Sequence, residues 1–469
     1  MHTIKHQWFG NIRDDILAGI VVGLALIPEA LAFAFIVGVD PRVALYASFT
    51  MAVITSFVGG RPGLISAATG AMALVLVGLM ANHGLEYVLA ATILTGIIQV
   101  ILGSLGVANL MRFIPNSVML GFVNALGIMI FISQMPYLIG SNSMTYIFAI
   151  ITLILVYVIP RFFKAIPAPL IAIVVMTIIA LLSGVKLQTI GELGSMPSTL
   201  PTFLFPDIPL NLETLRIIFP YSLALSIVGL LESLLTSQVL DDMTDTTSNK
   251  NREARGQGIA NFITGFFGGM AGCALIGQSM INIKSGGRQR LSTFTAGVFL
   301  MFLIIVLGDV VVDIPMPVLV GVMIMVSMTT FNWSSFKFLK QAPKSEAFVM
   351  IITVAIILYT SNLAIGVVIG VILSALFFVA KISRVTVTRD MNVYKVKGPL
   401  FFASTTKFMR VFDNVEENVI TIDFENSHLW DESAVGAILK VKHKLEQKGI
   451  KVNIQGLNSS SEQLYQQLI

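Results

Sequence analysis

The sequence has little charge and almost no cysteine. Only 12% of its 469 residues are Asp, Glu, Lys or Arg, whereas 55% are hydrophobic, and a typical soluble domain carries about 25% charged residues. This composition excludes an ordinary soluble enzyme, a disordered chain and a nucleic-acid-binding protein. The single cysteine, Cys273, excludes a disulfide framework and a cysteine-rich metal site.

Motifs for catalysis and for nucleotide binding are also missing. The five histidines are scattered and form no HExxH pair, and the sequence contains no P-loop motif. No cluster of His, Cys and Asp residues suggests a membrane enzyme or a bound metal. We therefore expect a protein that is not an enzyme, needs no cofactor and is not driven by ATP.

Long apolar runs fill the chain up to about Arg384. A transmembrane helix needs about 20 apolar residues, and runs of this kind recur throughout residues 1–384. Two of them are short and rich in Gly and Ser. The sequence predicts an all-α polytopic membrane protein with 14 transmembrane segments, centred near residues 26, 52, 73, 99, 127, 153, 175, 227, 263, 280, 299, 323, 353 and 372.

The basic residues predict the orientation of this membrane part. With the N-terminus inside and 14 spans, nearly all Lys and Arg residues fall in inner loops, and only Arg42, Lys186 and Arg216 fall outside. Loops that stay in the cytoplasm carry an excess of Lys and Arg. We expect a multi-pass protein of the cell membrane with both termini in the cytoplasm.

The composition changes at about Val385. Charged residues return, and NVYKVKGPLFFAS, VITIDFENS and KVNIQGL have the length and alternation of strands. Residues 432–448 form an amphipathic helical pattern followed by Gly449, a helix-stop signal. The order of strands and helices predicts a small α/β domain over residues 385–469, which the topology places in the cytoplasm.

Two segments of the membrane part match each other. FVGGRPG starts at Phe57 and FFGGMAG at Phe266, and each continues into small and hydroxyl residues and a short apolar run. A carboxylate, Glu29 or Glu232, lies upstream of each copy inside an apolar helix. An odd number of spans per repeat makes the repeats face opposite ways, which is the plan of many secondary transporters. The sequence therefore predicts two repeats of seven spans each, at about 12–184 and 214–384.

The two Gly-rich breaks predict an anion-binding site. A chain that enters the bilayer and then begins a half helix leaves backbone N–H groups that lipid cannot satisfy. A helix N-terminus carries about half a positive charge, so two facing termini attract an anion. Such stretches also serve close helix packing, but their repetition favours a site. The residues expected to line it are Thr69, Gly70, Ala71, Ala274, Leu275, Ile276, Gly277, Gln278 and Ser279.

Glu29 and Glu232 are the candidates for the coupling site. A carboxylate in the middle of a bilayer usually faces a cavity or a partner, where it can bind a proton or Na+. Thr236 lies one helical turn after Glu232 on the same face, and a carboxylate with a hydroxyl suits a hard cation. The alternative is a structural role, in which either Glu is hydrogen-bonded to a neighbouring helix. Glu29 also follows Pro28, where a helix can kink.

Other polar residues receive a simpler interpretation. Asp241, Asp242 and Asp245 resemble a metal cluster, but they end a span at the inner face and lie near Lys250. We therefore expect a solvated, charge-balanced loop. Cys273 is expected to be a small packing residue, although its place at the second break puts it close to the ligand.

Several of these segments resemble a known family. LALIPEALAFAFIVGVDPRVALYASF, from Leu24 to Phe49, is similar to the signature of the sulfate permease (SulP) family of anion transporters, as are ISAATGAM, LLESLLTS and NIKSGGR. A cytoplasmic STAS domain after the last span is also typical of that family. The resemblance implies a seven-plus-seven inverted repeat with core and gate subdomains, and a homodimer. It also implies an anion site between the third and tenth segments, at Thr69 and residues 274–279.

The family pattern also concerns the charge of the pocket. Glu232 and Thr236 match positions where members bind Na+ or titrate a proton, and a Glu there resembles the proton-coupled branch. Many members have Arg where Gln278 stands and Gln where Glu29 stands, so this pocket is two charges more negative. Either the helix dipoles suffice for a small anion, or Glu29 and Glu232 hold protons or cations while it binds, or a cation is itself transported.

The C-terminal domain contains a second partial match. Asp431-Glu432-Ser433-Ala434 is similar to the Asp-Ser-Ser-Gly loop in which related regulatory domains are phosphorylated, and Ser433 matches the phosphorylated serine. A helix N-terminus favours an added phosphate electrostatically. Because Glu432 and Ala434 depart from the pattern, a structural helix cap at Ser433 or a neighbour is the alternative. The resemblance implies a cytoplasmic regulator at this domain.

Together these features predict secondary active transport of a small inorganic anion of the sulfate or bicarbonate class. Transport would be coupled to H+, or to Na+, through Glu232 and would proceed by alternating access. The alternatives are an uncoupled anion channel or exchanger, or a dicarboxylate or nucleobase carrier of the same fold. The STAS-like domain argues against the nucleobase carrier.

Overall fold

The protein consists of two compact units. The computed structural model describes residues 7–162, 166–192, 196 and 199–469. One unit comprises Met1–Val371 and the other Ile372–Ile469, and each is described by itself. The division falls inside the helix Leu363–Ile382, which the sequence assigns to the membrane part.

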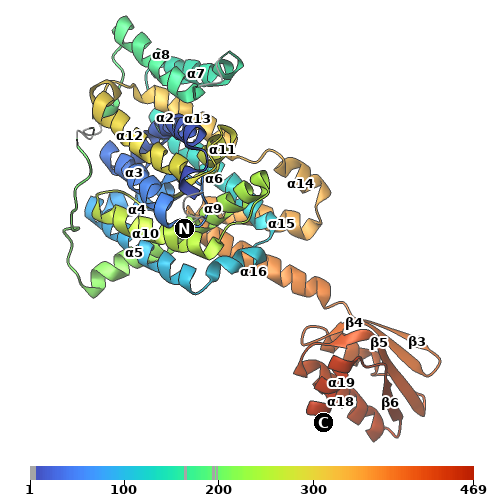
Figure 1. Ribbon diagram of the computed structural model, residues 1–469. Coiled ribbons are helices and arrows are strands. Elements are labelled where there is room, and N and C mark those ends of the chain that lie inside the picture. The colour runs from blue at the N-terminus through green and yellow to red at the C-terminus, as the bar shows by residue number, and fades with distance from the viewer. Residues whose placement is uncertain (1–6, 163–165, 193–195, 197–198) are drawn as a thin grey trace. The chain divides into compact units, whose positions relative to one another are not determined.

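The first unit is mostly helical (Figure 1). Within the described residues, nine helices are long and apolar enough to cross a membrane, and α4 and α8 are shorter apolar helices. The structure thus has the features of a polytopic membrane protein. Its helices are α2 (Ile12–Val37), α3 (Pro41–Val58), α4 (Gly70–His83), α5 (Leu85–Ser104), α6 (Asn116–Leu138), α7 (Ser143–Val158), α8 (Ala168–Ser183), α9 (Leu212–Thr244), α10 (Lys250–Phe266), α11 (Ile276–Lys284), α12 (Arg290–Val311), α13 (Met316–Thr330), α14 (Ser335–Gln341), α15 (Lys344–Thr360) and α16 (Leu363–Ile382), with short 3-10 helices η1 (Val107–Phe113), η2 (Ile159–Arg161) and η3 (Ile190–Glu192).

The membrane unit is not purely helical, which corrects the all-α expectation. Strand β1 (Ser66–Ala68) precedes α4, and strand β2 (Gly272–Ala274) precedes α11. The two strands pair antiparallel, with Ala67 opposite Cys273, and all six residues are buried. Each break in the helical path exposes backbone groups that lipid cannot satisfy, and the strands satisfy them by pairing with each other.

Helices from the two halves of the chain pack against each other. α2 and α3 contact α12, α5 contacts α10, and α6 contacts α13 and α15 (Figure 1). Small residues bring the backbones close together. A Cβ atom at Gly19 of α2 would lie 2.6 Å from the carbonyl oxygen of Ser292, and one at Gly258 of α10 would lie 2.7 Å from the carbonyl oxygen of Gly96.

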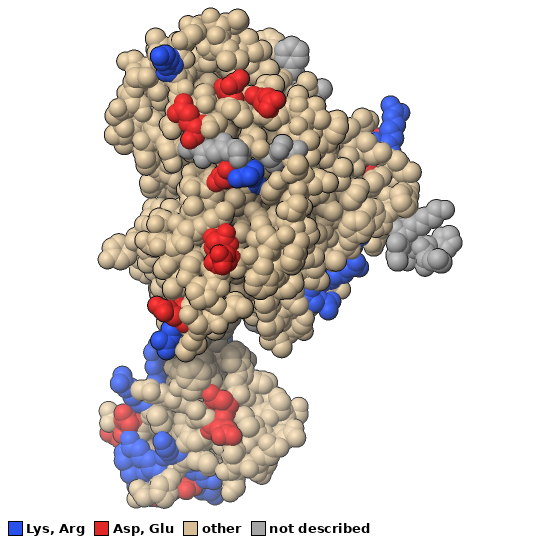
Figure 2. All heavy atoms as spheres, turned by 90° about the vertical axis from the view of Figure 1, so that its left-hand side faces the viewer, with Lys and Arg blue, Asp and Glu red and all other residues tan. Residues whose placement is uncertain are grey.

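The surface of each unit reflects its composition. On the face in Figure 2, the membrane unit presents broad areas without charged side chains, whereas Lys, Arg, Asp and Glu gather closely on the C-terminal unit. Exposed apolar side chains such as Leu182, Val306 and Leu376 lie on membrane helices. Such exposure is expected where lipid, rather than water, covers the protein.

The C-terminal unit carries a four-stranded mixed sheet of order β3-β4-β5-β6. β3 (Thr386–Asp390) and β4 (Val393–Leu400) are antiparallel, whereas β4, β5 (Val419–Leu429) and β6 (Lys451–Gln455) are parallel. Val435, Ile438 and Leu445 of the amphipathic helix pack into a core with Phe408 and Phe424. The predicted α/β domain is thus confirmed, with helices α17 (Thr405–Val411), α18 (Glu432–Gln447) and α19 (Ser459–Gln467).

Candidate functional site

The first turns of α4 and α11 line one cavity. α4 begins at Gly70, directly after Thr69, and α11 begins at Ile276. In the part of the chain that the structure describes, no acceptor is paired with the backbone N–H groups of Gly70, Ala71, Ile276, Gly277 and Gln278. All five residues line the same cavity. Free amides at two helix N-termini favour an anionic ligand.

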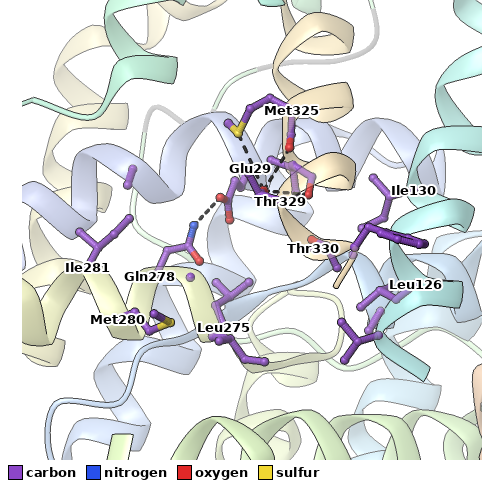
Figure 3. A pocket seen from close by; sticks show the side chains of 18 of the residues that line it. Glu29, Leu126, Ile130, Leu275, Gln278, Met280, Ile281, Met325, Thr329 and Thr330 are labelled. Carbon is purple, nitrogen blue, oxygen red and sulfur yellow. Dashed lines mark hydrogen bonds between the residues drawn. The ribbon is translucent and has the colours of Figure 1, made fainter. Parts of the chain in front are cut away.

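The cavity has a volume of about 790 Å3 and is largely apolar (Figure 3). Among the described residues that line it, none is Lys, Arg or His, and the two ionisable side chains are Glu29 and Glu232. Both approach from long helices, α2 and α9. Further parts of its wall come from α2, α6 and α13, through Phe33, Phe122, Leu126, Ile130, Val322, Met325, Val326, Thr329 and Thr330.

Glu29 and Gln278 contact each other across this cavity. The side-chain amide of Gln278 donates a hydrogen bond to the carboxylate of Glu29 (Figure 3). These are the two pocket positions at which the family resemblance leads us to expect Gln in place of Glu29 and Arg in place of Gln278. The Glu29 carboxylate therefore lies at the first turn of α11, where the free backbone amides are.

Glu232 reaches the breaks through Cys273. The Cys273 thiol is 3.0 Å from Oε2 of Glu232 and 3.1 Å from the hydroxyl oxygen of Thr69. The hydroxyl of Thr236 donates to the backbone carbonyl of Glu232 at 2.7 Å. The Thr236 hydroxyl is thus bonded to its own helix. Cys273, expected to be a packing residue close to the ligand, makes polar contacts on both sides.

Three of the expected lining residues lie behind the cavity wall. The Thr69 hydroxyl accepts from the Met72 amide at 3.3 Å and caps α4. The Ala274 amide donates to the Ser233 hydroxyl at 3.0 Å, and the Ser279 hydroxyl accepts from the Ile65 amide at 2.9 Å. These contacts fix the two breaks in place, while Gly70, Ala71, Leu275, Ile276, Gly277 and Gln278 line the cavity.

A buried polar stripe on α10 also positions the breaks, and sequence reasoning missed it. Glu253, Gln257, Asn261 and Thr264 are buried on one face of this helix. Asn261 donates to the carbonyl of Gly272 at 3.0 Å and accepts from its amide at 2.8 Å. The three- and four-residue spacing of these polar side chains along one helical face is a signal that could have identified it.

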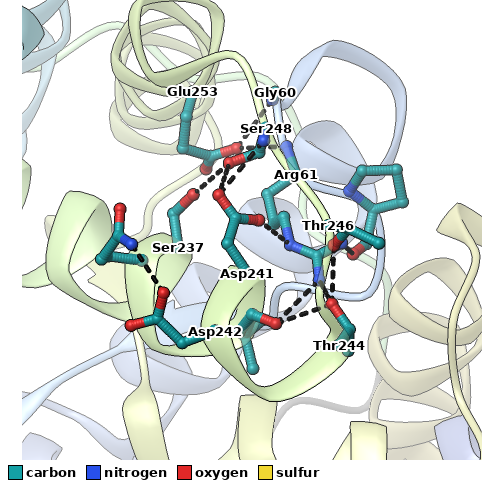
Figure 4. Close-up of polar contacts among 12 residues, drawn as sticks. Gly60, Arg61, Ser237, Asp241, Asp242, Thr244, Thr246, Ser248 and Glu253 are labelled. Carbon is teal, nitrogen blue, oxygen red and sulfur yellow. Dashed lines mark hydrogen bonds and ion pairs between the residues drawn. The ribbon is translucent and has the colours of Figure 1, made fainter.

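The same stripe holds the entry to β1. The Glu253 carboxylate accepts from the backbone amides of Gly60 and Arg61 at 2.7 and 2.9 Å (Figure 4). Gln257 donates to the hydroxyl of Ser66 at 2.6 Å. One helix of the second half therefore holds the backbone of both breaks.

The acidic cluster at the end of α9 corrects the expectation of a solvated loop for one residue. Asp241 is only 6% exposed and is paired with Nε of Arg61 at 2.8 Å and Nζ of Lys250 at 2.7 Å (Figure 4). Asp242 and Asp245 are exposed, as expected. Across residues 7–162, 166–192, 196 and 199–469, no group of three or more His, Cys, Asp or Glu side chains could hold a metal ion.

Comparison with known proteins matches most of the chain to two family models. The Sulfate permease family model matches residues 12–148 and 141–353, and the STAS domain model matches residues 383–469. YbaR of Bacillus subtilis (strain 168), which carries a provisional name as a sulfate transporter, is 57% identical over 99% of each chain. The bicarbonate transporter BicA of Picosynechococcus sp. is 28% identical over 85% of this chain and 76% of its own.

Solved structures of related proteins have the same fold. The transmembrane domain of a cyanobacterial bicarbonate transporter, BicA, covers 78% of this chain and 98% of its own, with 26% identity and a TM-score of 0.67. The murine Slc26a9 anion transporter in the inward-facing state covers 99% of this chain and 88% of its own, with 18% identity and a TM-score of 0.85. The chain therefore belongs to the sulfate permease family, as a multi-pass membrane protein with a C-terminal STAS domain.

Proposed function

We propose that this protein is a secondary active transporter of a small inorganic anion of the sulfate or bicarbonate class. The observation that carries the proposal is the cavity where the free amides of two half-helix N-termini, at Gly70 and Ile276, meet. The names of the relatives support the same class of substrate, since they include sulfate and bicarbonate transporters. Alternating access of this cavity to the two sides would complete the mechanism.

We propose that the membrane part, residues 1–384, has 14 spans in two inverted halves of seven. α2 to α8 would supply one half, and α9 to α13 with α15 and α16 the other. The antiparallel pairing of β1 with β2 supports this arrangement, because a two-fold axis in the membrane plane would relate equivalent strands in this way. Both termini and the domain 385–469 would lie in the cytoplasm, and the family resemblance supports a homodimer with core and gate subdomains.

We propose that Glu232 binds the coupling ion, a proton or Na+, with Glu29 as a second acidic group. An anion that enters this cavity meets two carboxyl groups and no Lys, Arg or His among the described lining residues. A bound proton or cation would remove the repulsion, so anion and coupling ion would bind together. Proton coupling is the first choice because a Glu at this position resembles the proton-coupled branch of the family.

Two other functions are compatible with the same cavity. An uncoupled channel or exchanger would use the helix termini without a coupling role for Glu232. A dicarboxylate or nucleobase carrier would need the apolar wall formed by Phe33, Phe122 and Leu126. Competition by succinate or uracil for the uptake of sulfate or bicarbonate would favour these carriers.

The test is uptake into proteoliposomes containing the full chain, across a panel of sulfate, bicarbonate, succinate and uracil. Imposed pH and Na+ gradients identify the coupling ion. Glu232→Gln is expected to abolish gradient-driven accumulation. Glu213→Gln is the matched control, because Glu213 lies exposed at the start of the same helix. Accumulation that persists in Glu232→Gln would eliminate Glu232 as the coupling group.

A further inference from the structure

Three side chains from three elements form a continuous buried line. Glu232 lies on α9, Cys273 on β2 and Thr69 directly before α4. Oε2 of Glu232 and the Cys273 sulfur are 3.0 Å apart, the sulfur and the Thr69 hydroxyl oxygen are 3.1 Å apart, and that oxygen is 3.3 Å from the Met72 amide. Cys273 and Thr69 are fully buried, whereas Glu232 also lines the cavity.

The donors and acceptors of these groups fix the direction in which hydrogen bonds are donated along this line. A backbone N–H can only donate, so the Thr69 oxygen accepts from Met72. The remaining hydroxyl hydrogen of Thr69 then points to the Cys273 sulfur, and the thiol hydrogen points to the carboxylate of Glu232. The whole line runs from the first turn of α4 to Oε2 of Glu232, which accepts from the thiol.

An ion bound at Glu232 reverses this direction. A proton or Na+ that occupies the Oε2 lone pair facing Cys273 removes the acceptor that the thiol uses. In both cases the Cys273 hydrogen loses its acceptor and must turn toward Thr69. The Thr69 oxygen has a second lone pair besides the one that Met72 uses, so it can accept the thiol hydrogen. The hydroxyl hydrogen of Thr69 must then leave the sulfur and turn to another acceptor at the start of α4. No covalent bond between heavy atoms changes; only hydrogens rotate about side-chain bonds.

We propose that Cys273 is a positioning residue that transmits the occupancy of Glu232 to the anion site at the start of α4. The inference rests on the proposed function, because it assigns a path between the coupling ion and the anion. Cys273 touches neither of them in this role. Cys273 connects Glu232 with this site through side chains, beside their shared cavity, because Gly70 and Ala71 follow Thr69 directly and line that cavity.

Besides Cys273, one titratable side chain, Glu29, interacts with Glu232, and the experiment has to separate its effect on transport from that of Glu232. Glu29 interacts with Glu232 through the cavity, and Cys273 is the side chain hydrogen-bonded to it. Among the described residues, α4, α5, α10, α11 and η1, which pack against α9, place no other charged side chain against Glu232. The experiment is therefore run in the wild-type chain and in a Glu29→Gln background.

A pure packing role makes a different prediction from a transmitting role. Ser retains the donor and acceptor of Cys in a slightly smaller side chain, whereas Ala removes both and has a similar small volume. If Cys273 only fills space, Cys273→Ser and Cys273→Ala should behave alike. If it transmits, the two variants should separate, with Ser close to the wild type.

The experiment measures KM for radiolabelled sulfate and for radiolabelled bicarbonate in proteoliposomes of the full chain, over a range of external pH and of Na+ concentration. Coupling between two sites typically changes affinity by about 5- to 150-fold. Cys273→Ser is expected to retain the ion dependence of KM. Cys273→Ala is expected to lose most of it, by at least threefold, and to have no further effect when combined with Glu232→Gln.

Thr69 provides the second test, in case Cys273→Ala does not fold. Thr69→Ser keeps the hydroxyl and should keep the ion dependence of KM, whereas Thr69→Val keeps the shape and should lose it. The proposal is overturned if Cys273→Ala or Thr69→Val retains the full dependence while Glu232→Gln loses it, and the proposed function then stands. If the wild-type chain takes up neither anion, the proposed function fails and this inference fails with it.

Discussion

The amide of Gln278 donates to the carboxylate of Glu29, so an acidic side chain is held at the N-terminal turn of α11. The free backbone amides of that turn are the groups that an incoming anion would use. The carboxylate and the anion therefore compete for one region of positive potential.

Glu29→Gln is expected to lower KM for sulfate or bicarbonate by about tenfold. A unit charge close to an anion in a partly hydrated cavity contributes roughly 1–3 kcal/mol of repulsion, and the substitution removes that repulsion. The effect should grow as pH rises, because only the ionised carboxyl repels an anion. Glu29→Asp, which retains the charge, is the control. An equal or higher KM in Glu29→Gln at alkaline pH would contradict this view of the cavity.

Gly277→Leu is expected to block transport without harming the fold. A Cβ at Gly277 would meet no heavy atom within 4 Å, and the residue lines the cavity, so a longer side chain would fill the space of the anion. Replacing a helical Gly removes a helix penalty of about 0.5–1 kcal/mol. Uptake should fall at least tenfold while the thermal unfolding midpoint in detergent stays the same or rises.

The control for this substitution is Gly436→Leu on α18, where a Cβ also meets nothing within 4 Å. It should leave uptake intact. Wild-type uptake by Gly277→Leu would show that the anion passes elsewhere.

Asp241→Asn is expected to destabilise the protein by roughly 3 kcal/mol. It removes the charge that compensates Arg61, whose side chain is only 8% exposed, and breaking a buried ion pair leaves the partner uncompensated. Asp242→Asn is the matched control, because the adjacent Asp242 is exposed and should change stability by less than about 0.5 kcal/mol. Thermal unfolding of both purified variants compares them, and equal midpoints would refute a stabilising role for the pair.

Two roles are expected at the loop that contains Ser433, namely capping of α18 and regulation, and the contacts of α18 assign the capping role. Asp431, not Ser433, is the N-cap: its carboxylate accepts from the amides of Ala434 and Phe402 at 3.0 and 2.8 Å. Asp431→Ala should lower the stability of the C-terminal unit by about 1–2 kcal/mol. Ser433→Ala should not, because Ser433 is exposed. Unfolding followed by Trp430 fluorescence tests both.

Ser433 remains our candidate for regulation. Ser433→Asp is expected to change the uptake rate without changing the unfolding of the C-terminal unit. If uptake by Ser433→Asp and Ser433→Ala is the same, Ser433 has no regulatory role through charge.

The large features of this protein could be predicted from local sequence patterns. Apolar runs and the return of charge after about residue 385 indicate the membrane helices and the α/β domain, since burial in lipid and in a small core demands those compositions. The matching breaks at Phe57 and Phe266 predicted two half helices, and α4 and α11 begin where expected.

The contacts between distant segments could not be predicted in the same way. The pairing of β1 with β2 and the approach of Cys273 to Thr69 join residues that lie far apart in the sequence. The placement of Asn261 on Gly272 joins a helix to a neighbouring strand. A short apolar run gives no sign that its backbone will need a partner strand. Cys273 and Asp241 resemble common packing and surface residues, and only their neighbours give them another role.

The pairing of β1 with β2 has a consequence for the integrity of the molecule. Each strand supplies the other's missing backbone partners, so neither half of the chain can complete this region alone. Two fragments divided between residues 184 and 214 would each display an unsatisfied strand edge and half of a binding pocket. They would have to associate in the membrane before either could hold a ligand, which makes the ligand site a joint product of both halves.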